Sequence, residues 1–227
     1  MLKKRLNKYS LLLHNLSLFN NIPEESVFEA LQFLHAKVKS YKKGETVIRI
    51  GETLIPAGII LEGRLEISFQ NNNDDSVNMN HFQSGETFGE AMVLADIPRS
   101  PMQAKTLENT VILFLNYKML YIKPSDYPYA GRLALNLLQS FALKNVFLNQ
   151  KIRIFSQKTL RDKILTYLNK TLPKDQTGGL KLPFSKTSAA EFLGVNRSAL
   201  SRELGRMKSE GMLREQDGKI YLPLKQN

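Results

Sequence analysis

The most informative segment of the chain reads SAAEFLGVNRSALSRELGRMK and runs from Ser188 to Lys208. It has the pattern of a short helix, a turn at Gly194 and a second helix, because glycine enters the left-handed conformation that ends a helix without steric cost. Ala189 and Ala190 are small enough to let two helices approach closely. These features predict a helix-turn-helix, whose second helix lies in the major groove of DNA.

The predicted second helix has two different sides. Its apolar residues recur at helical spacing: Val195, Leu200, Leu204 and Met207. Its polar residues fall on the opposite side: Arg197, Ser198, Ser201 and Arg202. An ordinary helical hairpin with solvated arginines is the alternative. We favour DNA binding, because a helix that contacts base edges needs such a polar side.

The charge of the chain supports this interpretation. The 227 residues carry a formal net charge of +11. From Phe155 to the end there are 14 Lys and Arg against 7 Asp and Glu, so this third carries +7 of the excess. A basic surface attracts the phosphate backbone of DNA. It would also suit RNA or a well-solvated surface, so charge supports the motif and does not replace it.

Composition also excludes several classes of protein. Cysteine is absent, which excludes disulfides, thiolate zinc sites and cysteine-ligated iron–sulfur clusters. His14, His35 and His81 lie in different segments, without the spacing of a metal site or a catalytic group. No apolar run approaches the roughly 20 residues of a transmembrane helix. We therefore expect a cytoplasmic protein that is not an enzyme and that holds no metal.

Short alternating apolar segments separated by glycines dominate the first half of the chain. They cover residues 45–50, 57–61, 64–69 and 111–115. Many short strands joined by glycine turns predict a β-sandwich or barrel. Before them, the sequence predicts an amphipathic leader helix at the N-terminus and a second helix that begins at Pro23.

A heptad pattern follows Asp126. Seven residues recur at alternating spacings of four and three: Ala134, Leu138, Phe141, Asn145, Leu148, Ile152 and Phe155. The pattern predicts a long helix that pairs with a second copy, with polar Asn145 fixing the register. The alternative is a single helix that packs on its own β domain. In a homodimer, two recognition helices would contact a palindromic DNA site.

Two further elements are predicted near the C-terminus. A helix is expected over about residues 158–169. Asp217-Gly218 lies between two alternating segments and is typical of a β-hairpin turn. A hairpin after a recognition helix forms the wing of a winged helix.

In this order the segments resemble the CRP/FNR superfamily of bacterial transcription regulators. The resemblance rests on Lys43-Gly-Glu, Ile60-Leu-Glu-Gly-Arg64, Gly85-Glu-Thr-Phe-Gly-Glu-Ala91 and the segment 193–204. It implies an α+β fold with an N-terminal double-stranded β-helix (jelly-roll) sensor domain over residues 1–125. A dimerisation helix and hinge would span 126–156, and a winged helix-turn-helix 157–227.

The resemblance also implies which residues contact DNA. Those expected to face the bases are Arg197, Ser198 and Arg202, with Asn196 and Ser201 beside them. Thr187, Ser188 and Lys219 would contact phosphates, which position the protein without specifying sequence. Several family members carry glutamate in place of Ser198, so we expect an operator different from that of the cyclic-AMP receptor.

The sensor domain matches the family less closely. The resemblance implies that a small molecule would contact these residues: Gly89, Glu90, Ala91, Arg99, Ser100, Val146 and Phe147. Arg99-Ser100 lies one residue too close to Glu90 for the phosphate-binding pair, although a one-residue deletion in the preceding loop would restore the match. Apolar Val146 and Phe147 stand where the cyclic-AMP receptor has hydroxyls for adenine, which argues against cyclic AMP because buried polar edges need partners. Glu90 and Arg99 could alternatively form a structural ion pair.

We therefore expect a homodimeric, sequence-specific transcription regulator that binds double-stranded DNA at a palindromic site. An effector of unknown identity would switch its DNA affinity, no cofactor is expected, and RNA polymerase would be a further partner. The alternative is a regulator that binds DNA constitutively and retains a vestigial effector pocket.

Overall fold

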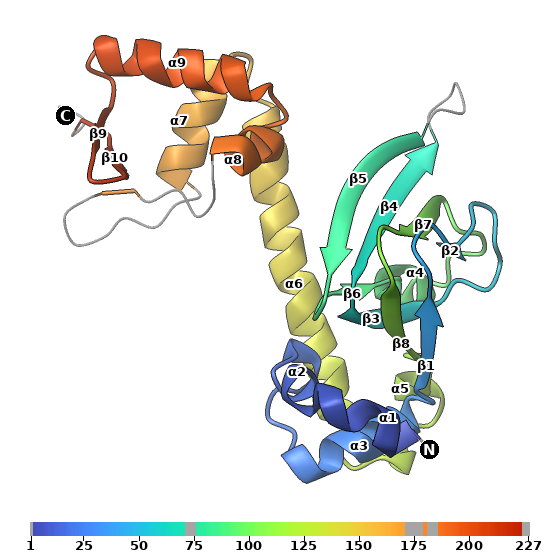
Figure 1. Ribbon diagram of the computed structural model, residues 1–227. Coiled ribbons are helices and arrows are strands. Elements are labelled where there is room, and N and C mark those ends of the chain that lie inside the picture. The colour runs from blue at the N-terminus through green and yellow to red at the C-terminus, as the bar shows by residue number, and fades with distance from the viewer. Residues whose placement is uncertain (1, 71–75, 171–178, 181–185, 224–227) are drawn as a thin grey trace. The chain divides into compact units, whose positions relative to one another are not determined.

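The computed structural model describes residues 2–70, 76–170, 179–180 and 186–223. The chain divides into two compact units, Met1–Ser140 and Phe141–Asn227, and the division falls inside helix α6 (Ala130–Phe155). Each unit has its own hydrophobic core. Figure 1 shows the elements in order along the chain. No helix among the described residues is both long and apolar enough to cross a membrane.

Short helical segments precede the first strand: α1 (Leu2–Leu6), η1 (Asn7–Tyr9), α2 (Ser10–His14), η2 (Ser17–Phe19) and α3 (Glu24–Phe33). The leader is amphipathic as predicted, because Leu6, Tyr9 and Leu13 are buried. It is not one continuous helix, since the 3₁₀ turn η1 interrupts it. At this turn the Lys8 ammonium lies 2.8 Å from the Glu62 carboxylate, which ties the leader to the β domain.

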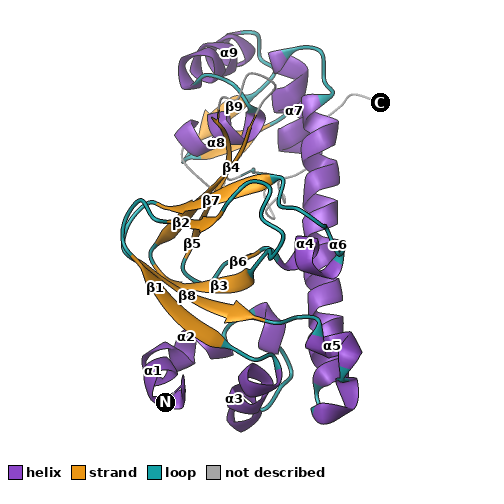
Figure 2. Ribbon diagram, turned by 90° about the vertical axis from the view of Figure 1, so that its right-hand side faces the viewer, coloured by secondary structure: helices purple, strands orange, loops and turns teal. Residues whose placement is uncertain are grey.

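Two four-stranded antiparallel sheets form the body of the first unit (Figure 2). One has the order β1-β8-β3-β6 and the other β2-β7-β4-β5. The strands are β1 (Lys37–Tyr41), β2 (Thr46–Ile48), β3 (Ala57–Glu62), β4 (Arg64–Gln70), β5 (Ser76–Gln83), β6 (Thr87–Phe88), β7 (Met102–Thr106) and β8 (Thr110–Leu115). Side chains from both sheets share one core, including Ile60, Ile112, Ile48 and Leu65. This arrangement confirms the predicted jelly-roll.

The sequence predicted β2, β3, β4 and β8 but not the other four strands. Of the four missed strands, β1, β5 and β6 are outer strands of their sheets and β7 is an inner one, and the burial of β1 shows why the pattern fails there. Of its five residues only Tyr41 is buried, because one edge of the strand has no neighbour in the sheet. Between and after the strands lie the short helices α4 (Glu90–Leu94), α5 (Met119–Ile122) and η3 (Pro124–Asp126).

The second unit contains the C-terminal part of α6, three further helices and a hairpin. These are α7 (Leu160–Lys170), α8 (Lys186–Leu193), α9 (Arg197–Ser209), β9 (Arg214–Gln216) and β10 (Lys219–Tyr221). Apolar residues of every one of these elements except β9 meet in its core, among them Ile154, Ile164, Leu193, Leu200 and Ile220. Ala189 and Ala190 are buried in α8, as predicted for a close helix contact. The predicted helix-turn-helix and hairpin are therefore both present.

Candidate DNA-binding surface and effector site

The turn between α8 and α9 depends on Gly194 and Asn196. Gly194 has φ +66°, a left-handed conformation that a residue with Cβ adopts only at a cost. Asn196 then caps α9, since its side-chain oxygen accepts hydrogen bonds from the Ser198 amide at 2.8 Å and the Ser198 hydroxyl at 2.6 Å. Together these two residues fix where α9 begins.

Helix α9 has a buried side and an exposed side. Leu200 and Met207 are buried, and Val195 and Leu204 pack against the same core. The residues predicted to contact bases are all exposed: Asn196, Arg197, Ser198, Ser201 and Arg202. The Ser198 hydroxyl donates its proton to Asn196, so toward a base it can act only as an acceptor. Burial thus separates the predicted base-contacting residues from the core-packing residues on one helix.

The wing and the first helix carry the predicted phosphate contacts. Asp217 and Gly218 have φ of 51° and 69°, the left-handed pair that a two-residue hairpin turn requires. Lys219 begins β10 and is half-buried, while Thr187 is exposed in the first turn of α8. The side chain of Ser188 lies outside the described residues. The Arg214 guanidinium stacks over the Tyr221 ring at 4.7 Å and joins the two wing strands.

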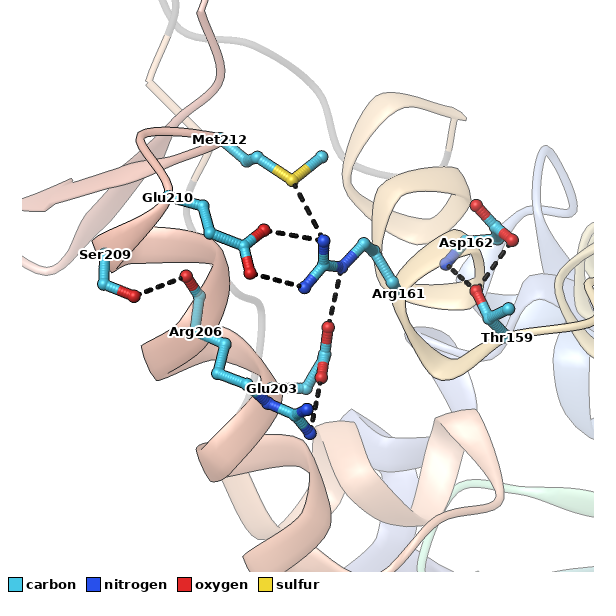
Figure 3. Close-up of polar contacts among 8 residues, drawn as sticks. All are labelled: Thr159, Arg161, Asp162, Glu203, Arg206, Ser209, Glu210 and Met212. Atoms are coloured by element: carbon cyan, nitrogen blue, oxygen red, sulfur yellow. Dashed lines mark hydrogen bonds and ion pairs between the residues drawn. The ribbon is translucent and has the colours of Figure 1, made fainter.

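A network of charged residues joins the buried side of α9 to α7 (Figure 3). The guanidinium of Arg161 donates to Glu203 at 2.8 Å and to both carboxylate oxygens of Glu210 at 2.6 and 3.1 Å. Arg206 also pairs with Glu203, at 2.9 Å. The hydrogen bond to Glu210 and, to a smaller extent, the one to Glu203 raise the pKa of Arg161 above its usual range. The local sequence pattern does not predict this network, although an acidic residue at Glu203, on the apolar side of a helix, indicates a buried partner.

The heptad residues of α6 are largely exposed in the single chain. Leu138 is 64% exposed, Leu148 55% and Ile152 61%. Asn145 is also exposed and accepts a hydrogen bond from the Asn149 side chain at 2.7 Å. Phe141 is half-buried. A row of large apolar side chains exposed along one helix is typical of an interaction surface.

The predicted effector residues at the start of α4 lie together. Gly89 has φ +78° and precedes α4, and a Cβ on it would lie 2.3 Å from the Pro56 carbonyl oxygen. The next residue, Glu90, is buried and accepts a hydrogen bond from the Thr87 hydroxyl at 3.1 Å. Ala91 is exposed. Burial, and the nearby Glu90 carboxylate, raise the pKa of the Tyr117 hydroxyl, a neighbour that the sequence analysis did not identify.

The other predicted effector residues make different contacts. The Arg99 guanidinium donates to the Gly51 carbonyl at 3.4 Å, and Arg99 is otherwise exposed. Ser100 is buried, and its hydroxyl donates to the Met102 carbonyl at 2.8 Å and accepts from the Met102 amide at 3.3 Å. Val146 and Phe147 belong to the second unit, where the Phe147 ring lies 5.7 Å from the ring of Phe192.

Two of the predicted effector residues, Arg99 and Ser100, make hydrogen bonds within the chain. A cyclic phosphate needs a cation and a hydroxyl that can donate to it, whereas the Ser100 hydroxyl donates to the Met102 carbonyl at the start of β7.

Each of the two units matches a known protein family. The cyclic nucleotide-binding domain family matches residues 38–121, and the Crp-like helix-turn-helix domain family matches residues 162–225. The chain belongs to the CRP/FNR family of transcription regulators. Its relatives are therefore transcription regulators and not enzymes.

Three known proteins illustrate the similarity of the chain to individual relatives. The transcriptional activator protein FnrA of Stutzerimonas stutzeri is 24% identical over 197 residues, which cover 84% of this chain and 78% of FnrA. Among solved structures, CprK complexed with OCPA has a TM-score of 0.57 at 16% identity, covering 86% of this chain and 91% of CprK. The sensor domain of the regulator DNR from Pseudomonas aeruginosa has a TM-score of 0.52 at 22% identity, covering 69% of this chain and 98% of the DNR sensor domain. At these identities the two structures show a shared fold and no more.

Proposed function

We propose that the chain is a homodimeric, sequence-specific transcription regulator, and that a small molecule in its N-terminal domain changes its affinity for DNA. Residues 1–125 would sense the molecule, 126–156 would form the dimer and the hinge, and 157–227 would bind DNA. RNA polymerase is the further partner that such a regulator requires.

The two faces of α9 carry this proposal. Arg197 and Arg202 are exposed, whereas Leu200 and Met207 of the same helix are buried, so the arginines can enter a groove without disturbing the core. An arginine can donate two hydrogen bonds to guanine O6 and N7. Thr187 and Lys219 would contact the phosphate backbone of the DNA on either side of that groove.

The exposed heptad residues support the dimer. Leu138, Leu148 and Ile152 would be covered by the same residues of a second copy, as a two-fold interface requires. Two recognition helices related by this axis would bind half-sites about 10 base pairs apart.

The effector is proposed to have a chemistry other than that of a cyclic nucleotide, because the Ser100 hydroxyl and the Val146–Phe147 pair do not suit one. The bonds of Arg99 to Gly51 and of Ser100 to Met102 also favour a second candidate, a constitutive DNA-binding regulator without an effector. The two candidates differ in whether any metabolite changes DNA affinity.

Selection from a randomised duplex library with the full chain tests the function. We expect enrichment of a palindrome, and no enrichment of any sequence would contradict it. The enriched duplex then serves to screen cyclic nucleotides and small aromatic acids for a change in affinity, with thermal unfolding in parallel, because a ligand that binds the folded protein raises its Tm. A compound that changes both identifies the effector, whereas none would favour the constitutive candidate.

A further inference from the structure

Glu203 is an unusual residue for its position in the recognition helix. It is the acidic residue next to Arg202, yet its side chain is only 9% exposed and shares the inner side of α9 with Leu200 and Met207. Burying a carboxylate is costly unless charged donors surround it. A helix that needed only packing at this point would carry an apolar residue. The arrangement indicates that the carboxylate has a role other than filling the core.

The partner of Glu203 contacts α9 at two points. Arg161 donates through Nε to Glu203 and through Nη1 and Nη2 to Glu210, which follows the last residue of α9 (Figure 3). Glu203 and Glu210 are seven residues apart, and seven residues are close to two full turns of a helix, so both carboxylates point to the same side. One planar guanidinium therefore binds α9 at two points about two turns apart, at Glu203 and at the residue that ends the helix.

Arg161 is itself held in place by the start of α7. The Thr159 hydroxyl accepts a hydrogen bond from the Asp162 amide at 3.1 Å and donates to the Asp162 carboxylate at 2.7 Å. This capping arrangement fixes the first turn of α7, in which Arg161 lies. Arg161 is only 32% exposed, so its guanidinium has few alternative positions. The bonds to Glu203 and Glu210 therefore join two helices whose ends are both defined.

We propose that Arg161 is a positioning residue that sets the rotation of α9 about its own axis, and thereby which base edges Arg197 and Arg202 face. The inference rests on the proposed function, since it concerns how sequence is discriminated. Rotating a helix by about 20° moves a side-chain tip roughly 6 Å from the axis by about 2 Å. Such a shift exceeds the tolerance of a hydrogen bond to a base.

Arginine is required for this task because of its shape. Its planar fork binds one carboxylate through two parallel N–H groups and still offers Nε to another, whereas a lysine ammonium is a single point of charge. Arg161→Lys would keep the charge and lose the two-point attachment. Arg206 provides a matched control. It also pairs with Glu203, but both belong to α9, so their bond does not relate the helix to α7.

The test compares Arg161→Lys with Arg206→Lys in the full chain. The duplex enriched by the wild type and a scrambled duplex are titrated at one salt concentration, and the ratio of the two Kd values is the specificity. We expect Arg161→Lys to lower this ratio by about tenfold or more, and Arg206→Lys to leave it near the wild-type value. A smaller loss in Arg161→Lys, or an equal loss in both variants, would overturn the proposal.

A second variant tests the proposal in case Arg161→Lys does not fold. Arg161→Met combined with Glu203→Leu replaces a largely buried ion pair by apolar groups, a change that often preserves stability. This variant is expected to melt near the wild-type Tm and still show the lowered ratio, and a wild-type ratio would overturn the proposal. A wild type that selects no duplex at all would instead contradict the proposed function.

Discussion

The ring of Phe147 lies 5.7 Å from the ring of Phe192, edge to face, and so joins α6 to the first helix of the helix-turn-helix. Phe192 also contacts the Tyr167 ring at 5.2 Å. Phe147 therefore has a structural role within the second unit, whatever its role toward an effector.

Replacing Phe147 by alanine tests that role. The variant should lose about 1 kcal/mol of stability, the usual contribution of an aromatic pair. Thermal unfolding of the full chain measures it. Leu143→Ala, which shortens an exposed side chain on the same helix, is the control, and an equal fall in Tm for both would show that the ring contact contributes nothing.

Arg197→Ala and Arg202→Ala should each weaken binding to the selected duplex by about 1–3 kcal/mol, the value of a two-point contact with guanine. Binding to scrambled DNA should change far less. Lys208→Ala, which also removes one exposed positive charge from α9, should weaken both duplexes similarly. Gel-shift titrations distinguish these outcomes, and equal losses on both duplexes for the arginines would refute their assignment to bases.

Leu138→Glu is expected to produce monomers, because it places a charge in the exposed apolar row of α6 and would oppose a second glutamate across the two-fold axis. Sedimentation velocity gives the mass in solution. Gln139→Glu adds the same charge beside the row and should leave the dimer intact. A dimeric Leu138→Glu protein would show that the interface lies elsewhere.

Asn196→Ala should lower stability by about 1 kcal/mol, since it removes the cap of α9. Asn196→Asp keeps an acceptor oxygen and should melt near the wild-type temperature. For DNA affinity we expect the reverse ranking: Asn196→Asp should bind more weakly than Asn196→Ala, because the new carboxylate repels phosphates. If the aspartate variant is as unstable as the alanine variant, the side chain does not act as a cap.

Stability should fall at alkaline pH through Tyr167. Burial raises the pKa of its hydroxyl from 10.0 to about 12, so the unfolded chain loses this proton first. The stabilisation is therefore complete below pH 10 and is lost as the pH rises toward 12. Tyr167→Phe should reduce this loss in urea titrations, whereas Tyr121→Phe, which changes an exposed ring, should not.

Much of the second unit could be predicted from local patterns. The spacing of Leu200 and Met207 predicted the buried side of α9, and Asp217-Gly218 predicted the hairpin turn, because each depends on residues close together in the sequence. The bond between Arg161 and Glu203 joins residues 42 positions apart, so no periodicity indicates it. The hydroxyl of Ser100 was also beyond prediction, since its bonds to Met102 depend on how β7 begins.

The division of α9 into two sides has a consequence for how such regulators diverge. Substitutions at Arg197, Ser201 or Arg202 change exposed groups that support no core contact, so they are expected to cost little stability. Changes at Leu200, Glu203 or Met207 carry the full penalty of a buried position. The proteins encoded by duplicated genes can therefore become specific for new operators through a few substitutions that cost little stability. The core beneath the recognition helix is meanwhile inherited almost unchanged.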